Sequence, residues 1–84
     1  MYKLFLTRRA AKEFDRLSPS LKKQIASVIN DIEKDPFECD ILKLKTPFEG
    51  YRIRTGNHRV LLVIEKKEIT IYSIQHRKDS YRSR

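Results

Sequence analysis

Three arginines close together in the middle of the chain, Arg52, Arg54 and Arg59, are the residues best suited to chemistry. A guanidinium group is always charged, and its planar fork bonds two oxygens of a phosphate at once. No acidic residue occurs between positions 50 and 64 to neutralise this charge. The cluster therefore predicts a site for an anion, and for a phosphate group in particular.

The spacing of these arginines predicts that they share one face of a β-hairpin. Gly56-Asn57 is a signal for a tight turn between two strand-like runs. With that turn, Arg54 faces Arg59, and Arg52 faces Leu61. Because side chains alternate between faces along a strand, the three arginines lie on one face. The other face is apolar and predicts one wall of the core, formed by Tyr51, Ile53, Val60, Leu62 and Ile64.

Electrostatics argues against a folding role for this cluster. Like charges that face each other on a sheet destabilise it, by about 1 to 3 kcal/mol for a pair about 5 Å apart at an effective dielectric of about 20 to 80. A bound anion would explain the arrangement. The alternative is that long arginine stems merely coat a solvent-facing sheet surface. The interpretation depends on the turn length, because a shift of one residue moves a whole strand to the opposite face.

Length and charge bound the class of protein. The chain has 84 residues, which suffice for one domain, 1–84, with a modest core. Its net charge of +8 and pI of about 9.9 point to a polyanionic partner, with nucleic acid ahead of an acidic protein or an anionic membrane. We expect no membrane segment, because no apolar run approaches the roughly 20 residues of a membrane span.

The same features predict a cytoplasmic protein. The N-terminal stretch is charged too soon for a secretory signal peptide. Cys39 is the single cysteine, which rules out an internal disulfide and argues against a cysteine-based zinc site. We expect no metal ion and no cofactor, and Cys39 is interpreted as a small loop residue.

The N-terminal half predicts a strand followed by two helices. Residues 2–6 are apolar and rich in strand formers, and Thr7 is placed to cap a helix over residues 8–17. Ser18-Pro19 restarts a second helix, which ends by Asp35 because the proline after it disfavours helical geometry. The second helix has the strongest apolar periodicity, at Leu21, Ile25, Val28, Ile29 and Ile32.

The C-terminal half predicts strands. Residues 37–40 form a loop, residues 41–45 alternate as a strand, and after the hairpin a polar turn leads to a last strand at 69–74. Residues 76–84 form a basic tail. We therefore predict an α+β fold of order β-α-α-β-β-β-β, in which an antiparallel two-helix hairpin packs on one face of a small, twisted, mostly antiparallel sheet. The arginines lie on the opposite, open face.

Two segments make the chain resemble a known family. The hairpin Tyr51-Arg-Ile-Arg-x-Gly-x-His-Arg59-Val-Leu and the ending Ile74-x-His76-Arg77-x-x-x-Tyr81-Arg82, together with the element order, resemble RelE/ParE-superfamily toxins of prokaryotic toxin–antitoxin pairs. The resemblance implies a microbial-ribonuclease-like RelE fold. It also implies a cognate antitoxin as partner, which wraps over the toxin in a toxin–antitoxin hetero-oligomer.

The resemblance separates two branches by activity. RelE-like toxins cleave mRNA in the ribosomal decoding site without a metal ion, whereas ParE-like toxins inhibit DNA gyrase and lack the ribonuclease residues. RelE-like enzymes have basic residues at the positions of Arg52, Arg54 and Arg59, a basic residue or histidine at that of Arg77, and an aromatic residue at that of Tyr81. All these positions are suitably filled here, which favours the RelE branch, with the ribosome as partner. A ParE-like gyrase inhibitor and an inactive RNA- or antitoxin-binding module are the alternatives.

For the RelE branch, the implied reaction is attack of a ribose 2′-hydroxyl on the adjacent phosphate. Arg59 stabilises the charge of the transition state, and Arg77 lies near the leaving oxygen. Arg52 and Tyr81 complete the predicted catalytic set. The best-studied relatives have lysines in the hairpin where this chain has arginines, and arginine is a poor base. The general base is therefore left open between His76 and Tyr81.

Further residues are predicted to hold the RNA, since phosphate contacts position a nucleic acid without reading its sequence. Lys43 and Lys45 share a face of their strand and either extend this track or are simply solvated. His58 is interpreted as structural, because alternation turns it toward the core. Substrate-binding roles are assigned to Arg54, His76, Lys43, Lys45 and Arg82.

Overall fold

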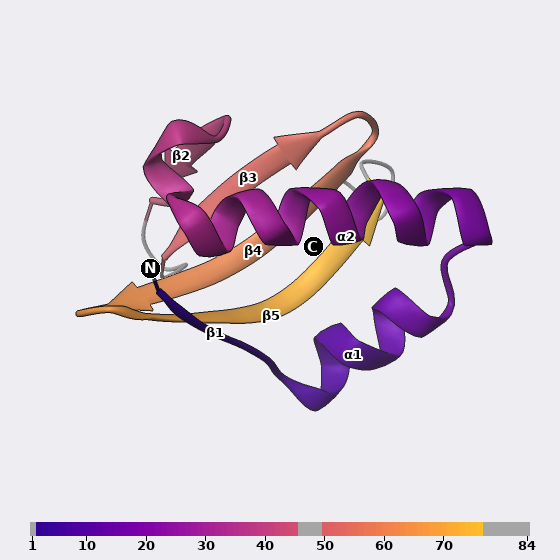
Figure 1. Ribbon diagram of the computed structural model, residues 1–84, viewed down its shortest axis with the longest axis horizontal. Coiled ribbons are helices and arrows are strands. Elements are labelled where there is room, and N and C mark those ends of the chain that lie inside the picture. The colour runs from indigo at the N-terminus through magenta and orange to yellow at the C-terminus, as the bar shows by residue number, and fades with distance from the viewer. Residues whose placement is uncertain (1, 46–49, 77–84) are drawn as a thin grey trace.

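The computed structural model describes residues 2–45 and 50–76, and its elements follow the predicted order β-α-α-β-β-β-β (Figure 1). The described elements are β1 (Lys3–Leu6), α1 (Arg8–Asp15), α2 (Pro19–Lys34), the short 3-10 helix η1 (Pro36–Glu38), β2 (Ile41–Lys43), β3 (Tyr51–Thr55), β4 (His58–Glu65) and β5 (Glu68–His76). η1 occupies part of the segment that was predicted as a loop.

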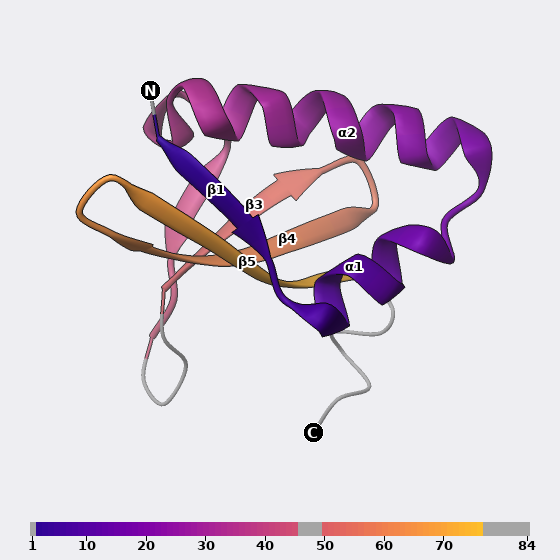
Figure 2. The ribbon, with the colours of Figure 1, turned by 60° about the horizontal axis from the view of Figure 1, so that its bottom comes forward.

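The strands form a single sheet in the order β1-β5-β4-β3-β2. β1 pairs with β5 in parallel, and the β2–β3, β3–β4 and β4–β5 pairs are antiparallel. α2 spans one face of this sheet, as Figures 1 and 2 show. The predicted α+β fold, with two helices on a mostly antiparallel sheet, is confirmed.

Both helices begin at the predicted caps. The Thr7 hydroxyl accepts a hydrogen bond from the Ala10 amide, and the Ser18 hydroxyl accepts one from the Leu21 amide, with Pro19 in the first turn of α2. α2 ends before Asp35, as predicted. α1 ends at Asp15 rather than Leu17, because the last turn tightens before the chain enters the cap of α2.

α1 lies against β5, at the place where β1 has ended. The Thr7 amide donates to the Ile71 carbonyl at 2.9 Å, and the Thr7 hydroxyl donates to the Tyr72 carbonyl at 3.3 Å. The chain therefore leaves the sheet edge and turns directly into the helix. α2 then runs back across the sheet (Figure 1), while α1 packs mainly on β5.

β2 and β5 end at residues other than those predicted. β2 stops at Lys43 instead of residue 45, although the Leu44 amide still donates to the Gly50 carbonyl at 2.9 Å. β5 extends to His76 instead of Ile74, because Arg59 and His58 of β4 pair with Gln75 and His76. The longer β5 brings His76 into the sheet.

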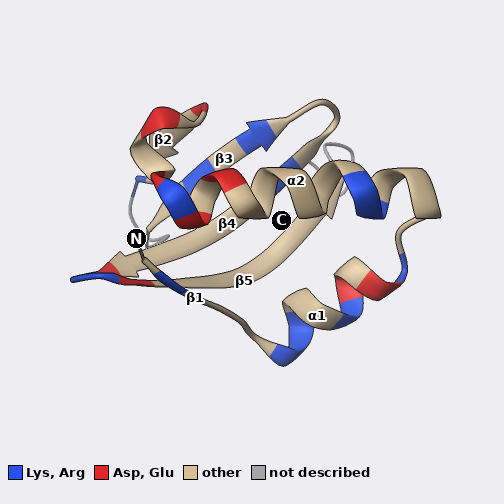
Figure 3. Cartoon of the chain, viewed as in Figure 1, with Lys and Arg blue, Asp and Glu red and all other residues tan. Residues whose placement is uncertain are grey.

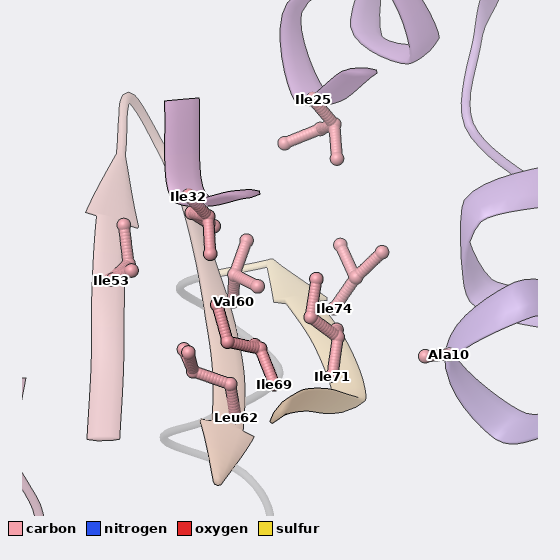
Figure 4. Close-up of a cluster of buried hydrophobic side chains, with 9 residues drawn as sticks. All are labelled: Ala10, Ile25, Ile32, Ile53, Val60, Leu62, Ile69, Ile71 and Ile74. Carbon is pink, nitrogen blue, oxygen red and sulfur yellow. The ribbon is translucent and has the colours of Figure 1, made fainter. Parts of the chain in front are cut away.

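The core lies between the helices and one face of the sheet (Figure 4). Three predicted wall residues, Ile53, Val60 and Leu62, are almost fully buried there, as are Ile25 and Ile32 of α2. Burying each such side chain stabilises the fold by about 1.5 to 3 kcal/mol. The buried hydrophobic residues are Ala10, Ile25, Ile32, Ile53, Val60, Leu62, Ile69, Ile71 and Ile74.

Gly50 sets the start of β3. Its φ of +91° lies in a region that residues with a side chain rarely adopt. A Cβ atom at this position would also clash with the backbone carbonyl oxygen of Leu62 on β4. Only glycine therefore lets the chain enter the hairpin this close to the neighbouring strand.

Candidate functional site

The predicted register of the hairpin is confirmed. Arg54 pairs with Arg59 across the ladder, Arg52 pairs with Leu61, and Thr55 pairs with His58 around the Gly56-Asn57 turn. Gly56 has a φ of +56°, which suits the first position of a tight hairpin turn. Since Ile53 and Val60 point into the core, Arg52, Arg54 and Arg59 share the opposite face, which we call the arginine face.

One acidic residue does reach the arginine face. Arg54 Nε lies 3.2 Å from Asp40 Oδ2, and the Arg54 amide donates to the Asp40 carbonyl at 3.1 Å. Asp40 lies outside the stretch 50–64 that the sequence argument considered, and β2–β3 pairing brings it in. Both side chains are more than half exposed, at 59% and 57%, and such surface pairs contribute only about 0 to 1 kcal/mol. An incoming phosphate can therefore displace the carboxylate.

The arginine face also has apolar residues. Phe5 of β1 and Leu42 of β2 are bulky apolar residues that are 50% and 55% exposed. Leu42 pairs with Arg52, and Leu61 stands opposite that arginine on β4. The face thus combines cationic groups with apolar surface, as single-stranded nucleic-acid sites do.

The structure does not bring Lys43 to the arginine face. The β2–β3 register pairs Leu42 with Arg52 and Lys43 with Tyr51, so alternation turns Lys43 toward the other side of the sheet edge. Lys45 lies beyond the end of β2. The strand prediction gave the two lysines a common face but could not say which face it was.

His76 is also separated from the arginines. It pairs directly with His58, and the two rings meet edge to face with centroids 5.0 Å apart. His58 is 6% exposed, so its predicted position on the core side is confirmed. His76 shares that side, next to α1, whereas Gln75 is the residue that pairs with Arg59. Arg77, Tyr81 and Arg82 lie outside the described residues.

Glu13 is a site residue that the sequence analysis missed. Its Oε1 accepts hydrogen bonds from the Ile74 amide at 2.8 Å and from the Ser73 hydroxyl at 3.0 Å, and its Oε2 faces Arg9 Nε at 3.4 Å. β5 needs these acceptors because β1 has already ended beside it. An acidic residue among the basic residues of α1 was the available signal.

Cys39 lies in a second charged region, at the start of β2. Burial raises the pKa of its thiol, and the carboxylates of Asp31, Asp35 and Glu38 raise it further. The thiol donates to the Asp35 carbonyl at 3.7 Å. A thiol held in its protonated form is a poor nucleophile, which agrees with the interpretation of Cys39 as a loop residue.

Positive charge extends beyond the hairpin. Figure 3 shows Lys and Arg along both helices as well as on β3. No helix in the described part of the chain is long and apolar enough to cross a membrane. Basic surface on several elements suits a large polyanion better than a small one.

The fold, two helices on an open and mostly antiparallel five-stranded sheet, matches the fold of RelE-like toxins. A chain of the RelB-RelE antitoxin-toxin complex from Methanococcus jannaschii superposes with a TM-score of 0.79 at 23% identity, covering 95% of this chain and 98% of that one. For the archaeal RelE-RelB complex from Pyrococcus horikoshii the TM-score is 0.77 at 22% identity, with coverage of 90% and 94%. For the intact E. coli RelBE complex it is 0.72 at 23% identity, with coverage of 90% and 96%.

The sequence itself identifies the family. Residues 4–81 match the family model described as ParE toxin of type II toxin-antitoxin system, parDE. The protein belongs to this family and is a toxin of a toxin–antitoxin system. A search of curated proteins finds no match. The structural likeness, at these identities, establishes the RelE-like fold.

Proposed function

We propose that this toxin is a ribosome-dependent mRNA endoribonuclease that acts in the cytoplasm. The observation that supports it best is the direct pairing of Arg54 with Arg59, with Arg52 on the same face of the hairpin. Guanidinium groups gathered in this way repel one another, and a bound anion reduces that repulsion. A phosphodiester is the anion that their planar, bidentate geometry fits best.

The proposed step is an internal transfer at one phosphodiester. The ribose 2′-oxygen forms a bond to phosphorus while the bond from phosphorus to the 5′-oxygen breaks, which leaves a 2′,3′-cyclic phosphate and a 5′-hydroxyl. A base takes the proton of the 2′-hydroxyl, and the leaving 5′-oxygen gains a proton. Arg52 and Arg59 stabilise the extra negative charge at phosphorus, and Arg54 holds the backbone beside them.

The remaining roles are assigned to the C-terminal segment. His76 faces α1 rather than the arginines, so we no longer assign it the proton of the 2′-hydroxyl. Tyr81 is the remaining candidate for the base, a role that requires arginines close enough to make its hydroxyl more acidic. Arg77 is placed near the leaving oxygen and Arg82 on the RNA backbone.

A cognate antitoxin is the proposed protein partner. The M. jannaschii, P. horikoshii and E. coli structures named above are toxin complexes with RelB antitoxins. With a net charge of +8, this chain favours an acidic antitoxin in a hetero-oligomer. A small acidic reading frame next to the toxin gene is the expected finding, and its absence would count against the pairing.

The direct test maps mRNA 5′ ends on translating ribosomes. Wild-type toxin should produce cuts at a fixed position within codons, and Arg59→Ala should abolish them. Arg59→Lys keeps the charge but loses the bidentate fork, so an intermediate rate is expected. Lys23→Gln, an exposed site on α2, is the matched control and should cut like wild type. Wild-type toxin that produces no cuts would refute the proposal.

The second candidate function is inhibition of DNA gyrase. The ParE family match favours it directly, and the Arg54–Asp40 ion pair also favours it, because that pair partly neutralises the arginine face. Supercoiling by purified gyrase should fall when toxin is added if this function holds. One assay measures mRNA cleavage and the other measures supercoiling, so running both on the same protein preparation distinguishes the two functions.

A further inference from the structure

A groove of about 400 Å³ lies on the helix side of the sheet, between α1 and the adjoining ends of β4 and β5. We call it the α1 groove. Arg9 and Glu13 line it from α1, Arg16 lines it from the residue that caps the end of α1, and His58 and His76 line it from the strands. It is separated from the arginine face by the sheet itself, because His58 and Arg59 are neighbours that point to opposite sides.

Two histidines form the sheet side of the α1 groove. His58 and His76 are direct cross-strand partners, with ring centroids 5.0 Å apart and ring planes at 84°. Histidine is the side chain that changes charge between pH 5 and 8, and both ring nitrogens are donors once it is protonated. The pair supplies only two of the four ligands of a typical zinc site, and the arginines beside it would repel a cation.

The carboxylate of Glu13 is already occupied. It accepts hydrogen bonds from the Ile74 amide and the Ser73 hydroxyl, and it pairs with Arg9. Arg16 makes no ion pair with any residue in 2–45 or 50–76. The α1 groove therefore has one more positive than negative group before either histidine gains a proton, and each proton adds to that excess.

The α1 groove adjoins the arginine face around one end of the sheet. His58 follows the Gly56-Asn57 turn directly, and the Arg54–Arg59 pair is the next rung of the same ladder. Cationic groups consequently surround this end of the sheet from both sides. A nucleic-acid strand bound across Arg54 and Arg59 can continue over the end of β4 into the groove.

We propose that the α1 groove is a second phosphate site, which holds the backbone of the same RNA and binds it more tightly as the histidines are protonated. That the RNA is the substrate rests on the proposed function, whereas the anion chemistry rests on the groove alone. The charged groups that face the histidines are Arg9, Glu13 and Arg16; within the described residues, α2 adds none to the lining.

The proposal fixes the sign of the pH dependence. A phosphate that binds the protonated pair more tightly raises the pH at which the imidazoles lose their protons. The affinity for RNA, whose phosphodiesters keep one negative charge over this range, is therefore greatest at acidic pH and falls as pH rises toward 7.5. Salt should weaken binding at every pH, since the contacts are ionic.

The experiment follows the imidazole carbon-bound protons of the full chain by NMR between pH 5.5 and 7.5. Inorganic phosphate, acetate and a short unstructured RNA are added in separate titrations. Phosphate and RNA should shift both His58 and His76 and raise their titration midpoints. The proposal is overturned if neither imidazole responds to phosphate or RNA. It is equally overturned if acetate shifts them and RNA does not, since that result assigns the groove to an acidic protein segment.

Single-residue variants test whether RNA binding depends on the α1 groove. His58 is buried and its replacement risks unfolding, so His76→Gln and Arg16→Gln are the variants of choice, with Lys23→Gln as the exposed control on α2. At pH 5.5, RNA binding should weaken at least about threefold in both variants and stay unchanged in the control. His76→Gln should also flatten the pH dependence. Unchanged RNA binding in both variants would refute the site.

The two experiments distinguish failure of the proposed ribonuclease function from failure of the proposed phosphate site. Absence of mRNA cleavage together with these imidazole shifts removes the ribonuclease and leaves the phosphate site in place. Cleavage of mRNA without the shifts keeps the ribonuclease and removes the phosphate site.

Discussion

Neighbouring residues of β4 lie on opposite faces of the sheet, one in the core and the other at the surface. His58, Val60 and Leu62 point inward and are 6%, 0% and 0% exposed, whereas Arg59 and Leu61 point outward and are only partly buried. Packing holds the inward set in place, so the outward set need not contribute to stability. One strand can therefore support the fold and present a binding surface, because alternation separates the two roles.

Substitution of two adjacent leucines, Leu61 and Leu62, should show the largest difference in stability between the two faces of β4. Leu62→Ala removes a fully buried side chain and should lower the free energy of unfolding by about 3 to 5 kcal/mol. Leu61→Ala, on the outward face, should lower it by about 1 kcal/mol or less. Urea denaturation followed by circular dichroism measures both. Equal losses would show that the outward face also belongs to the core.

Gly50→Ala should have the next largest effect. The new methyl group forces an unfavourable positive φ and meets the Leu62 carbonyl oxygen of β4, so we expect a loss of about 2 to 4 kcal/mol. Gly56→Ala is the control, since its Cβ would meet only the flexible side chain of Gln24, and about 1 kcal/mol is expected from its positive φ. Thermal unfolding ranks the two. A milder effect at Gly50 would contradict the close approach of β3 to β4.

Glu13→Ala should loosen the α1 side of the sheet. It leaves the Ile74 amide and the Ser73 hydroxyl without their acceptor, which costs about 1 to 3 kcal/mol. Hydrogen exchange at the Ile74 amide should accelerate more than exchange at the Val60 amide. Glu33→Ala, a partly buried glutamate of α2, is the control. Unchanged protection of the Ile74 amide would refute the role of Glu13 as its acceptor.

Asp40→Asn should change RNA binding more than it changes stability. Loss of an exposed ion pair changes the free energy of unfolding by about 0.5 kcal/mol or less, but it frees Arg54 to bind an anion. RNA binding at low salt should strengthen by a few-fold, because one negative charge leaves the arginine face. Asp15→Asn on α1 is the charge-matched control. If RNA binding strengthens equally in the control, the effect comes from the net charge of the protein and not from the Arg54–Asp40 pair.

The smallest expected effect concerns the rate at which the Cys39 thiol reacts, not the stability of the fold. The raised pKa of Cys39 keeps its thiol protonated at neutral pH, so iodoacetamide should alkylate folded protein more slowly than urea-unfolded protein at pH 8. The difference should shrink as pH rises and the folded thiol ionises. Faster alkylation of the folded form would show that the carboxylates around Cys39 do not act on it.

Local signals explain why much of the fold was predictable. The Thr7 and Ser18-Pro19 caps act within a single helical turn, and Gly56-Asn57 fixes the register of the two strands that it joins. Such signals depend on neighbouring residues only. The Arg54–Asp40 pair and the Ile74–Glu13 bond join residues that are far apart in the chain, and they were missed because no local pattern marks them.

Local sequence was enough to place the three arginines on one face of the hairpin, because strand alternation and a two-residue turn leave no other arrangement. The residues that surround this face depend on how distant strands pair. The order of the strands brought Asp40 to Arg54, turned Lys43 away from the arginines and placed His76 beside His58 under α1. Pairing between distant strands depends on the packing of the whole core, and a short stretch of sequence does not contain that information.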